Sequence, residues 1–359
     1  MANGTDRFVV EAAPGRSVEV LTAGPQDGLP LVFHTGTPAG LVAFPPLVEA
    51  ATTRGFRSVF YARPGYGNSG AQPARRVADA AADVALVLDQ IGARRFVTAG
   101  WSGGGPHALA TAALLADRCV AAATIAGIAP YPARDLDWLA GMAAENVTEF
   151  GAATEGETAL EALLGPVAEV LADVTAEQVA EALGDLVTAA DRAALTGEFA
   201  AYMAQSTRAA LSTGIAGWRD DDLAFVRDWG LNLDQVRVPV SVWQGDQDAM
   251  VPFAHGQWLA GRLPQADAHL MAGEGHLTLI NARIGDILDD LGRHAARVIA
   301  GLPACRTRPP ARAARLCISL WTSCERRPLA VDKRDTSCGQ PKESCNYSPN
   351  ALCDPPRWQ

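Results

Sequence analysis

As far as about residue 300, short apolar runs alternate along the chain with longer amphipathic stretches of hydrophobic and polar residues. An apolar run with few polar interruptions predicts a strand that is buried on both faces. Two shorter runs, 8–10 and 18–21, predict an antiparallel pair at the edge of a sheet. The longer runs cover 29–33, 58–62, 97–100, 120–128, 238–243 and 268–271.

Apolar residues spaced three or four positions apart predict amphipathic helices between these strands. Helices are expected at about 45–54, 75–91, 253–262 and 278–299, and directly after residue 102. In 75–91 the spaced positions are Val77, Ala81, Val84, Leu88 and Ile91. Strand–helix alternation of this kind implies an α/β fold with a mainly parallel sheet and helices on both faces.

The alternation stops between about 131 and 235, where the sequence is rich in alanine and glutamate and has no convincing strand. One helix there is predicted to start at Thr175-Ala176-Glu177-Gln178, which has capping-box spacing. An all-helical insert of this length is most simply placed over the strand ends, as a cap. The predicted division is a core at 1–130 and 237–300, a helical cap at 131–236 and a tail at 301–359.

Charge separates the body of the chain from its tail. The formal net charge is −10, and residues 1–300 hold 35 acidic residues against 20 arginines and no lysine. An acidic body disfavours nucleic acid and anionic membrane surfaces as partners, because both are themselves negative. We therefore expect a small-molecule substrate, no nucleic-acid partner and no membrane partner. The sequence makes no prediction of oligomeric state.

Cysteines are concentrated in the tail 301–359. It contains no histidine and no C-x-x-C pair, which disfavours zinc, and a disulfide framework would need an oxidising compartment. Residues 1–7 are not a basic segment followed by an apolar one, so we expect no signal peptide and a cytoplasmic protein. The tail is expected to be disordered. Its cysteines are Cys305, Cys317, Cys324, Cys338, Cys345 and Cys353.

The main chemical motif is Gly100-Trp101-Ser102-Gly103-Gly104, between an apolar strand and an alanine-rich helix. Gly-x-Ser-x-Gly in that context is typical of a nucleophile elbow, a sharp turn that exposes the serine hydroxyl above a sheet. Glycines flank the serine because the helix backbone passes close to the strand. We therefore expect Ser102 to be a nucleophile.

Residues 1–300 resemble the α/β-hydrolase fold superfamily, in particular its capped, esterase-like members with a serine nucleophile. The resemblance rests on the elbow, the loop 34–38, the turn 63–69 and two downstream motifs at 245–252 and 273–277. It does not extend to the tail. In this fold the catalytic residues follow the chain order nucleophile, acid, histidine.

A serine hydroxyl needs a base to take its proton during attack, and histidine suits this role. His276 is one of six histidines, lies after the serine in the chain and follows a predicted strand, where catalytic groups gather in such sheets. His34 also ends a strand but precedes the serine, so it is expected to support its loop. The others are expected to be ordinary packing or surface residues: His107, His255, His269 and His294.

A carboxylate should orient this histidine and stabilise its charged form. Segment 245–252 offers Asp246 and Asp248. The family pattern, Gly-x-x-Asp before a Val-Pro step, selects Asp248. Asp246 is an alternative that is more typical of turn capping, and Glu274 is a weaker one.

Acyl transfer also needs N–H donors for the developing oxyanion. Gly103 directly follows the serine at a helix N-terminus, so its N–H is expected to be one donor. The resemblance assigns the second to Thr37, with Gly36 as the alternative. Many relatives carry His-Gly where this chain has Thr35-Gly36.

No metal or cofactor is predicted, because the sequence has no H-E-x-x-H motif and the glycine run 103–105 lacks a P-loop lysine. The run 220–222, Asp-Asp-Asp, resembles a metal-ligand run only superficially and is predicted to be a solvated helix start. Trp101 is expected to point away from the site. Three further tryptophans are expected to be core residues rather than pocket lining: Trp138, Trp218 and Trp229.

A serine at the elbow argues against haloalkane dehalogenase and epoxide hydrolase activity, because those enzymes use a carboxylate nucleophile in this fold. The Trp-Gly-Gly-Ser-Trp-Gly elbow of proline iminopeptidases is also absent. The sequence predicts a serine hydrolase that cleaves a small or medium carboxylic ester through an acyl-enzyme on Ser102. Alternatives are hydrolysis of a carbon–carbon bond, cofactor-free perhydrolysis or haloperoxidase chemistry, and a non-enzymatic ligand-binding protein.

Overall fold

The computed structural model describes residues 4–13 and 15–301, so the tail predicted at 301–359 lies, apart from Gly301, outside the described residues. Eight strands form one sheet in the order β1-β2-β4-β3-β5-β6-β7-β8. β2 is antiparallel to β1 and β4, and all other neighbours are parallel. This confirms the predicted mainly parallel sheet with an antiparallel edge. The strands are β1 (Thr5–Ala13), β2 (Arg16–Ala23), β3 (Leu29–His34), β4 (Phe56–Tyr61), β5 (Phe96–Trp101), β6 (Cys119–Ile125), β7 (Val240–Gly245) and β8 (Ala266–Met271).

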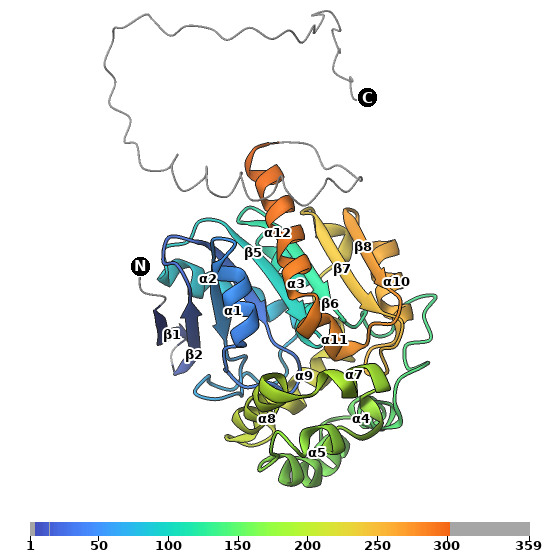
Figure 1. The fold of residues 1–359 in the computed structure, drawn as a ribbon. Helices are drawn as coiled ribbons and strands as arrows, with labels where there is room; N and C mark the ends of the chain where they lie inside the picture. The colour runs from blue at the N-terminus through green and yellow to red at the C-terminus, as the bar shows by residue number, and fades with distance from the viewer. Residues whose placement is uncertain (1–3, 14, 302–359) are drawn as a thin grey trace, which may run out of the picture.

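Helices cover both faces of the sheet (Figure 1). One face packs against α1, α11 and α12, and the other against α2, α3 and α10. The short 3₁₀ helix η1 (Val77–Asp79) leads into α2. The helices are α1 (Pro45–Thr52), α2 (Ala80–Gln90), α3 (Gly104–Leu114), α10 (Phe253–Arg262), α11 (His276–Ala282) and α12 (Ile284–Ile299).

The single helix predicted at 278–299 is wrong, because the structure has two helices there. The backbone of Arg283 leaves helical geometry, with φ −107° and ψ 3°. Its guanidinium reaches back to Glu274, with Nε 2.7 Å from Oε1. The apolar periodicity continues across the break, so periodicity alone did not reveal it.

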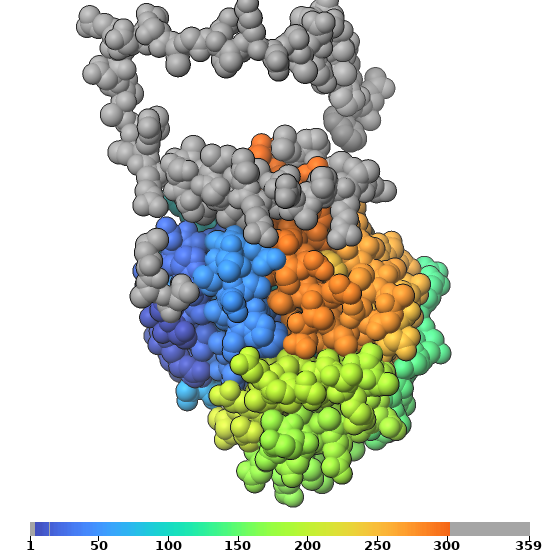
Figure 2. Space-filling model, viewed as in Figure 1, coloured from blue at the N-terminus to red at the C-terminus, as the bar shows by residue number. Residues whose placement is uncertain are grey.

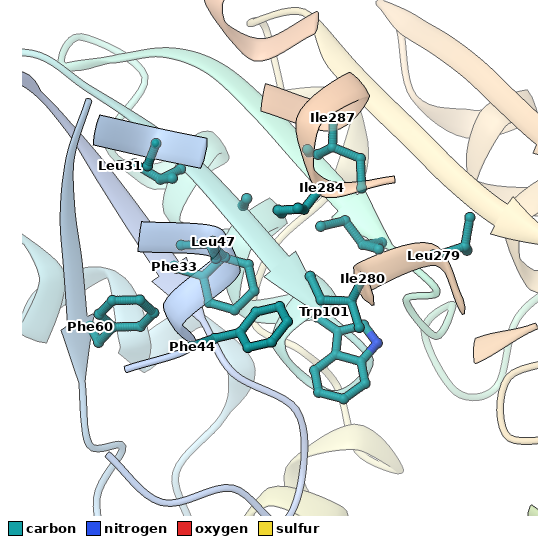
Figure 3. Packing of buried hydrophobic residues seen from close by; sticks show 14 of the residues in the cluster. Leu31, Phe33, Phe44, Leu47, Phe60, Trp101, Leu279, Ile280, Ile284 and Ile287 are labelled. Carbon is teal, nitrogen blue, oxygen red and sulfur yellow. The ribbon is translucent and has the colours of Figure 1, made fainter. Parts of the chain in front are cut away.

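Side chains on each central strand alternate between two apolar layers. In β3, Leu31 and Phe33 pack with α1 and α12, whereas Val32 between them packs on the opposite face. Figure 3 shows Phe33 lying among Phe44, Leu47 and Phe60. Both faces of β3 are therefore dry, as its continuous apolar sequence predicts.

All described helices between β6 and β7 gather at one end of the sheet (Figure 1). Figure 2 shows them as a continuous green layer against the blue and orange parts of the core. The segment contains no strand, as predicted. Its helices are α4 (Ala144–Glu155), α5 (Glu157–Leu171), α6 (Val179–Ala182), η2 (Gly184–Leu186), α7 (Ala189–Ala194), α8 (Gly197–Leu211) and α9 (Ala216–Phe225), followed by η3 (Leu233–Gln235).

The helix start predicted at Thr175 is wrong by about one turn. Its N–H does donate to Gln178 Oε1, at 3.1 Å. However, residues 176–178 form a turn, and α6 begins only at Val179. The capping interaction stabilises a turn that precedes the helix.

Within the part of the chain that the structure describes, no helix combines the length and apolarity needed to cross a bilayer. Cys119 in β6 is buried. Burial raises the pKa of its thiol to about 12, so this thiol stays neutral at physiological pH.

Truncation of Leu47 should destabilise the fold strongly. Leu47 is fully buried between α1 and the sheet. We expect Leu47→Ala to lower the free energy of unfolding by about 2–5 kcal/mol, because it leaves a cavity. Urea denaturation followed by circular dichroism measures this. The matched variant Leu114→Ala, 43% exposed at the end of α3, should lose much less, and equal losses would contradict this account of the core.

Candidate active site

β5 and α3 meet in a sharp turn at Ser102. Ser102 has a φ of 56°, in the left-handed region that residues with a Cβ seldom adopt. The glycines around it permit close approach of backbones: a Cβ on Gly100 would lie 2.0 Å from the carbonyl oxygen of Gly104, and one on Gly104 would lie 2.0 Å from that of His34. The turn is therefore held in its strained shape by β3 and by its own helix.

Ser102 opens onto a cavity of about 530 Å³ between the sheet and the helices α4–α9. Most of the residues around the cavity are apolar, and the insert helices contribute many of them. Thr37, Gly103 and His276 also line it. The structure thus brings four of the five predicted site residues to one cavity.

Asp248, the fifth, lies behind His276. Its Oδ2 is 2.9 Å from His276 Nδ1 and also accepts a bond of 3.0 Å from Gln244 Nε2. Its Oδ1 accepts the N–H groups of Met250 at 2.9 Å and Val251 at 2.8 Å. Four donors therefore hold the carboxylate in place.

The environment of His276 favours its charged form. Burial lowers the pKa of the imidazole, but the charge of Asp248 and its hydrogen bond raise it further, so the pKa lies above its ordinary value. Nδ1 donates to the carboxylate, which leaves the lone pair of the neutral ring on Nε2. Among the described residues Nε2 has no hydrogen-bond partner.

The two alternative acids, Asp246 and Glu274, make hydrogen bonds with residues other than His276. Asp246 Oδ1 accepts from Gly273 N–H at 2.8 Å, which is the turn-capping role expected for it. Glu274 Oε1 pairs with Arg283 at 2.7 Å. Neither makes a hydrogen bond with His276 within the described chain.

The loop after β3 touches the elbow. A Cβ added to Gly103 would lie 2.5 Å from Thr37 Oγ1. In the described part of the chain, no hydrogen bond is formed by the backbone N–H of either Thr37 or Gly103. Two unused donors therefore flank Ser102, as an oxyanion site needs.

Asp220, Asp221 and Asp222 are all buried inside α9, so the prediction of a solvated helix start is wrong. Asp221 Oδ2 is 2.6 Å from Arg63 Nη2, and Oδ1 is 2.7 Å from Arg75 Nη1. Burial raises the pKa of Asp221, but these two positive charges hold it below its ordinary value. Both arginines come from loops far away in the sequence, and helical periodicity gives no sign of them.

Asp191 in α7 is a site-forming residue that the sequence analysis missed. Its carboxylate accepts three N–H groups at the start of α11: His276 at 3.0 Å, Leu277 at 2.7 Å and Thr278 at 3.1 Å. A Cβ on Gly275 would lie 2.3 Å from Asp191 Oδ1. The glycine before His276 was the only local hint that something approaches there.

Trp101 does not point away from the site, contrary to the prediction. It lines the cavity, and its Nε1 donates to the carbonyl oxygen of His276 at 3.2 Å. Trp218 is buried and also lines the cavity, whereas Trp138 and Trp229 are core residues, as expected. The indole of Trp101 therefore supports the first turn of α11, where His276 lies.

His34 and His107 are both buried. Packing was expected of His107, whereas His34 was expected to support its loop. His34 lies between Tyr61 and Thr98, with 3.1 Å contacts to both hydroxyls. His107 Nδ1 is 2.9 Å from the carbonyl oxygen of Gly103, and burial followed by the charge of Arg63 lowers its pKa to about 3. His107 is thus a neutral ring beneath the elbow.

A further cluster, formed by Asp267, His269 and Asp290, joins β8 to α12. These three could share a metal ion, and the sequence analysis did not find them. Arg293 pairs with both aspartates, and His294 Nε2 lies 3.2 Å from Asp267. Arg293 therefore offsets part of the negative charge of the two carboxylates within the protein.

Loss of the Asp221 charge should be costly. We expect Asp221→Asn to destabilise the protein by about 3–5 kcal/mol, since it leaves Arg63 and Arg75 buried without a counter-charge. Urea denaturation measures the effect. The matched variant Asp228→Asn removes an exposed carboxylate next to Arg76 and should change stability little. A similar small change in both would show that the buried network is not stabilising.

Comparison with known proteins places this geometry in a family. Residues 30–282 match the profile of the alpha/beta hydrolase fold. The chain is also 30% identical over 196 residues to pimeloyl-[acyl-carrier protein] methyl ester esterase of Aromatoleum aromaticum, a match that covers 52% of this chain and 68% of that protein.

Solved structures agree in fold. A bromoperoxidase from Bacillus anthracis aligns with a TM-score of 0.58 and 20% identity, covering 80% of this chain and 100% of its own. An esterase from Rhodococcus sp. ECU1013 aligns with a TM-score of 0.55 and 20% identity, covering 79% of this chain and 98% of its own. Since the family profile spans more than half of the chain and the sheet agrees with these structures, the chain belongs to the α/β hydrolase fold family.

Proposed function

We propose that this protein is a serine hydrolase that cleaves small or medium carboxylic esters through an acyl-enzyme on Ser102. One observation carries the proposal: Ser102, the His276–Asp248 pair and two unused backbone N–H groups converge on one cavity. The name of the Aromatoleum relative, a methyl ester esterase, supports ester chemistry.

In the proposed reaction, His276 Nε2 takes the proton of Ser102 as its Oγ attacks the ester carbonyl. Asp248 orients the ring and stabilises the imidazolium. The N–H groups of Thr37 and Gly103 bind the oxyanion. Collapse of the tetrahedral intermediate expels the alcohol, which takes the proton from His276. Water, deprotonated by the same ring, then hydrolyses the acyl-enzyme and restores Ser102.

The helices α4–α9 would act as a cap in this reaction. They supply apolar walls such as Phe150, Leu164 and Val179. A cavity of about 530 Å³ is in the size range of small-molecule sites. Apolar walls lower the local dielectric, which strengthens the electrostatic interactions around the reacting carbonyl.

Removal of the serine hydroxyl tests the nucleophile. We expect a fluorophosphonate to add once to the wild-type protein and not to Ser102→Ala, as measured by intact mass. The kcat/KM for a short-chain ester should fall by at least about 10³-fold in this variant. Ser212→Ala, at an exposed position after α8, is the control and should label normally. Absence of an adduct on folded wild-type protein would overturn the proposal.

The pH profile tests the base. His276 must be neutral to accept a proton, so kcat/KM should rise with pH, with a midpoint above the ordinary value of 6.5. Asp248→Asn removes the charge that raises this pKa, so the acidic limb should move to lower pH while kcat drops by about 10⁴-fold. Ester hydrolysis followed by chromatography between pH 5 and 9 measures both. If the acidic limb of the pH profile stays in place in Asp248→Asn, the Asp248–His276 pair does not set its midpoint.

A further inference from the structure

Arg63 is a buried cation that lies behind the active-site cavity. It is the first residue of the segment 63–69 that follows β4, and its side chain is only 2% exposed. It is not among the described residues that line the cavity around Ser102. Any effect of Arg63 on the reaction must therefore pass through the groups to which it binds.

The guanidinium of Arg63 binds three consecutive residues of the loop after β3. Its Nη1 donates to the carbonyl oxygen of Thr35 at 2.7 Å. Its Nη2 donates to the carbonyl oxygen of Gly36 at 2.8 Å and to Thr37 Oγ1 at 2.9 Å. The N–H groups of a guanidinium form a rigid planar fork, so two carbonyl oxygens bonded to it fix the orientation of the loop backbone.

The bond to Gly36 decides which way the N–H of Thr37 points. The two groups belong to one peptide unit, which is not among the cis peptides of the described chain. In a trans peptide the C=O and the N–H lie in one plane and point in opposite directions. With its oxygen fixed on Arg63, the unit directs the N–H of Thr37 away from Arg63. That N–H has no hydrogen-bond partner among the described residues.

The charge of Arg63 also strengthens this N–H as a donor. A cation that donates to a carbonyl oxygen polarises the peptide unit, so the N–H at the other end becomes more positive. The helical insert holds the guanidinium in place: Nη2 lies 2.6 Å from Asp221 Oδ2, and Thr37 Oγ1 donates to the same oxygen at 2.9 Å. Arg63, Thr37 and Asp221 thus form a closed triangle of hydrogen bonds.

Arg75 provides a comparison within the same network. Its Nη1 lies 2.7 Å from Asp221 Oδ1, and its side chain is 3% exposed. Its Nη2 donates to the carbonyl oxygen of Gly217 at 3.1 Å and lies 3.5 Å from that of Pro64. Within the described chain it makes no hydrogen bond with residues 35–37. The two arginines therefore share a counter-ion and a degree of burial, but only Arg63 binds the loop.

We propose that Arg63 is a positioning residue of the oxyanion site, which fixes the peptide unit between Gly36 and Thr37 so that the N–H of Thr37 meets the oxyanion. Because Asp221 lies on α9, the insert takes part in assembling this site. This inference rests on the proposed ester hydrolysis. It adds that Arg63 contributes to binding of the transition state and not to binding of the ester itself.

A pair of ketones tests this role without turnover. In hexyl trifluoromethyl ketone, Ser102 Oγ bonds to the carbonyl carbon, the serine proton passes to His276, and the carbonyl electron pair moves to the oxygen, which becomes an oxyanion. Hexyl methyl ketone is a much weaker electrophile and should bind without this addition. The ratio of their inhibition constants therefore measures how well the site stabilises an oxyanion.

Arg63→Lys keeps the positive charge but loses the fork. Loss of one oxyanion donor costs about 10²–10³ in kcat, so a misdirected donor should lower both the ketone ratio and kcat at least about tenfold. KM should change by less than about threefold. The matched variant Arg75→Lys should retain the ketone ratio within about threefold. An unchanged ratio in Arg63→Lys, or equal losses in both variants, would overturn the positioning role and leave ester hydrolysis standing.

Urea denaturation shows whether the arginine variants fold. If either does not, the side chain of Thr37 decides, since the backbone N–H remains when it is replaced. Thr37→Val removes the hydroxyl that Arg63 binds and should lower the ketone ratio at least about threefold, whereas Thr37→Ser should retain it; equal ratios would overturn the role. If wild-type protein shows neither inhibition by the trifluoromethyl ketone nor a fluorophosphonate adduct, the proposed function itself is wrong.

Discussion

The buried carboxylate of Asp221 joins the helical insert to two loops of the core. It pairs with Arg63 and Arg75 and accepts hydrogen bonds from Tyr66 and Thr37, each at 2.9 Å. Burial of two cations with one anion is less costly where their remaining donors are also satisfied. Arg63 meets this condition by donating to the loop after β3, at the carbonyl oxygens of residues 35 and 36, 2.7 Å and 2.8 Å away. The geometry of that loop therefore depends on a side chain from α9.

A second carboxylate of the insert holds the other side of the cavity. Asp191 binds the first N–H groups of α11, where an anion is stabilised by the helix dipole. His276 is the first residue of α11, so its backbone is held at two points, at its N–H by Asp191 and at its carbonyl oxygen by the indole of Trp101. The insert is thus part of the framework of the cavity, and a displacement of α7 or α9 would move groups next to Ser102.

The same insert decides the chemistry of the cavity wall. Its apolar residues provide most of the surface, and its acids provide the charge. In α9, three consecutive aspartates have three different surroundings: Asp220 pairs with Arg219, Asp221 with Arg63 and Arg75, and Asp222 lies beside Glu149 at the cavity. Burial acts to raise the pKa of all three carboxyl groups, but only at Asp221 do two buried guanidinium charges hold the pKa below its ordinary value.

The sequence by itself determined the features that local sterics and periodicity control. Continuous apolar runs predicted the strands because both faces of the sheet are dry. Gly100 and Gly104 predicted the turn at Ser102 because no Cβ fits between strand and helix. The tertiary structure alone decided what depends on partners distant in the chain. The burial of Asp221, the contact of Asp191 with α11 and the orientation of Trp101 arise between segments many residues apart. Such contacts leave no periodic trace in the sequence, because each is one pairing of charge or hydrogen bond that forms only when the fold is complete.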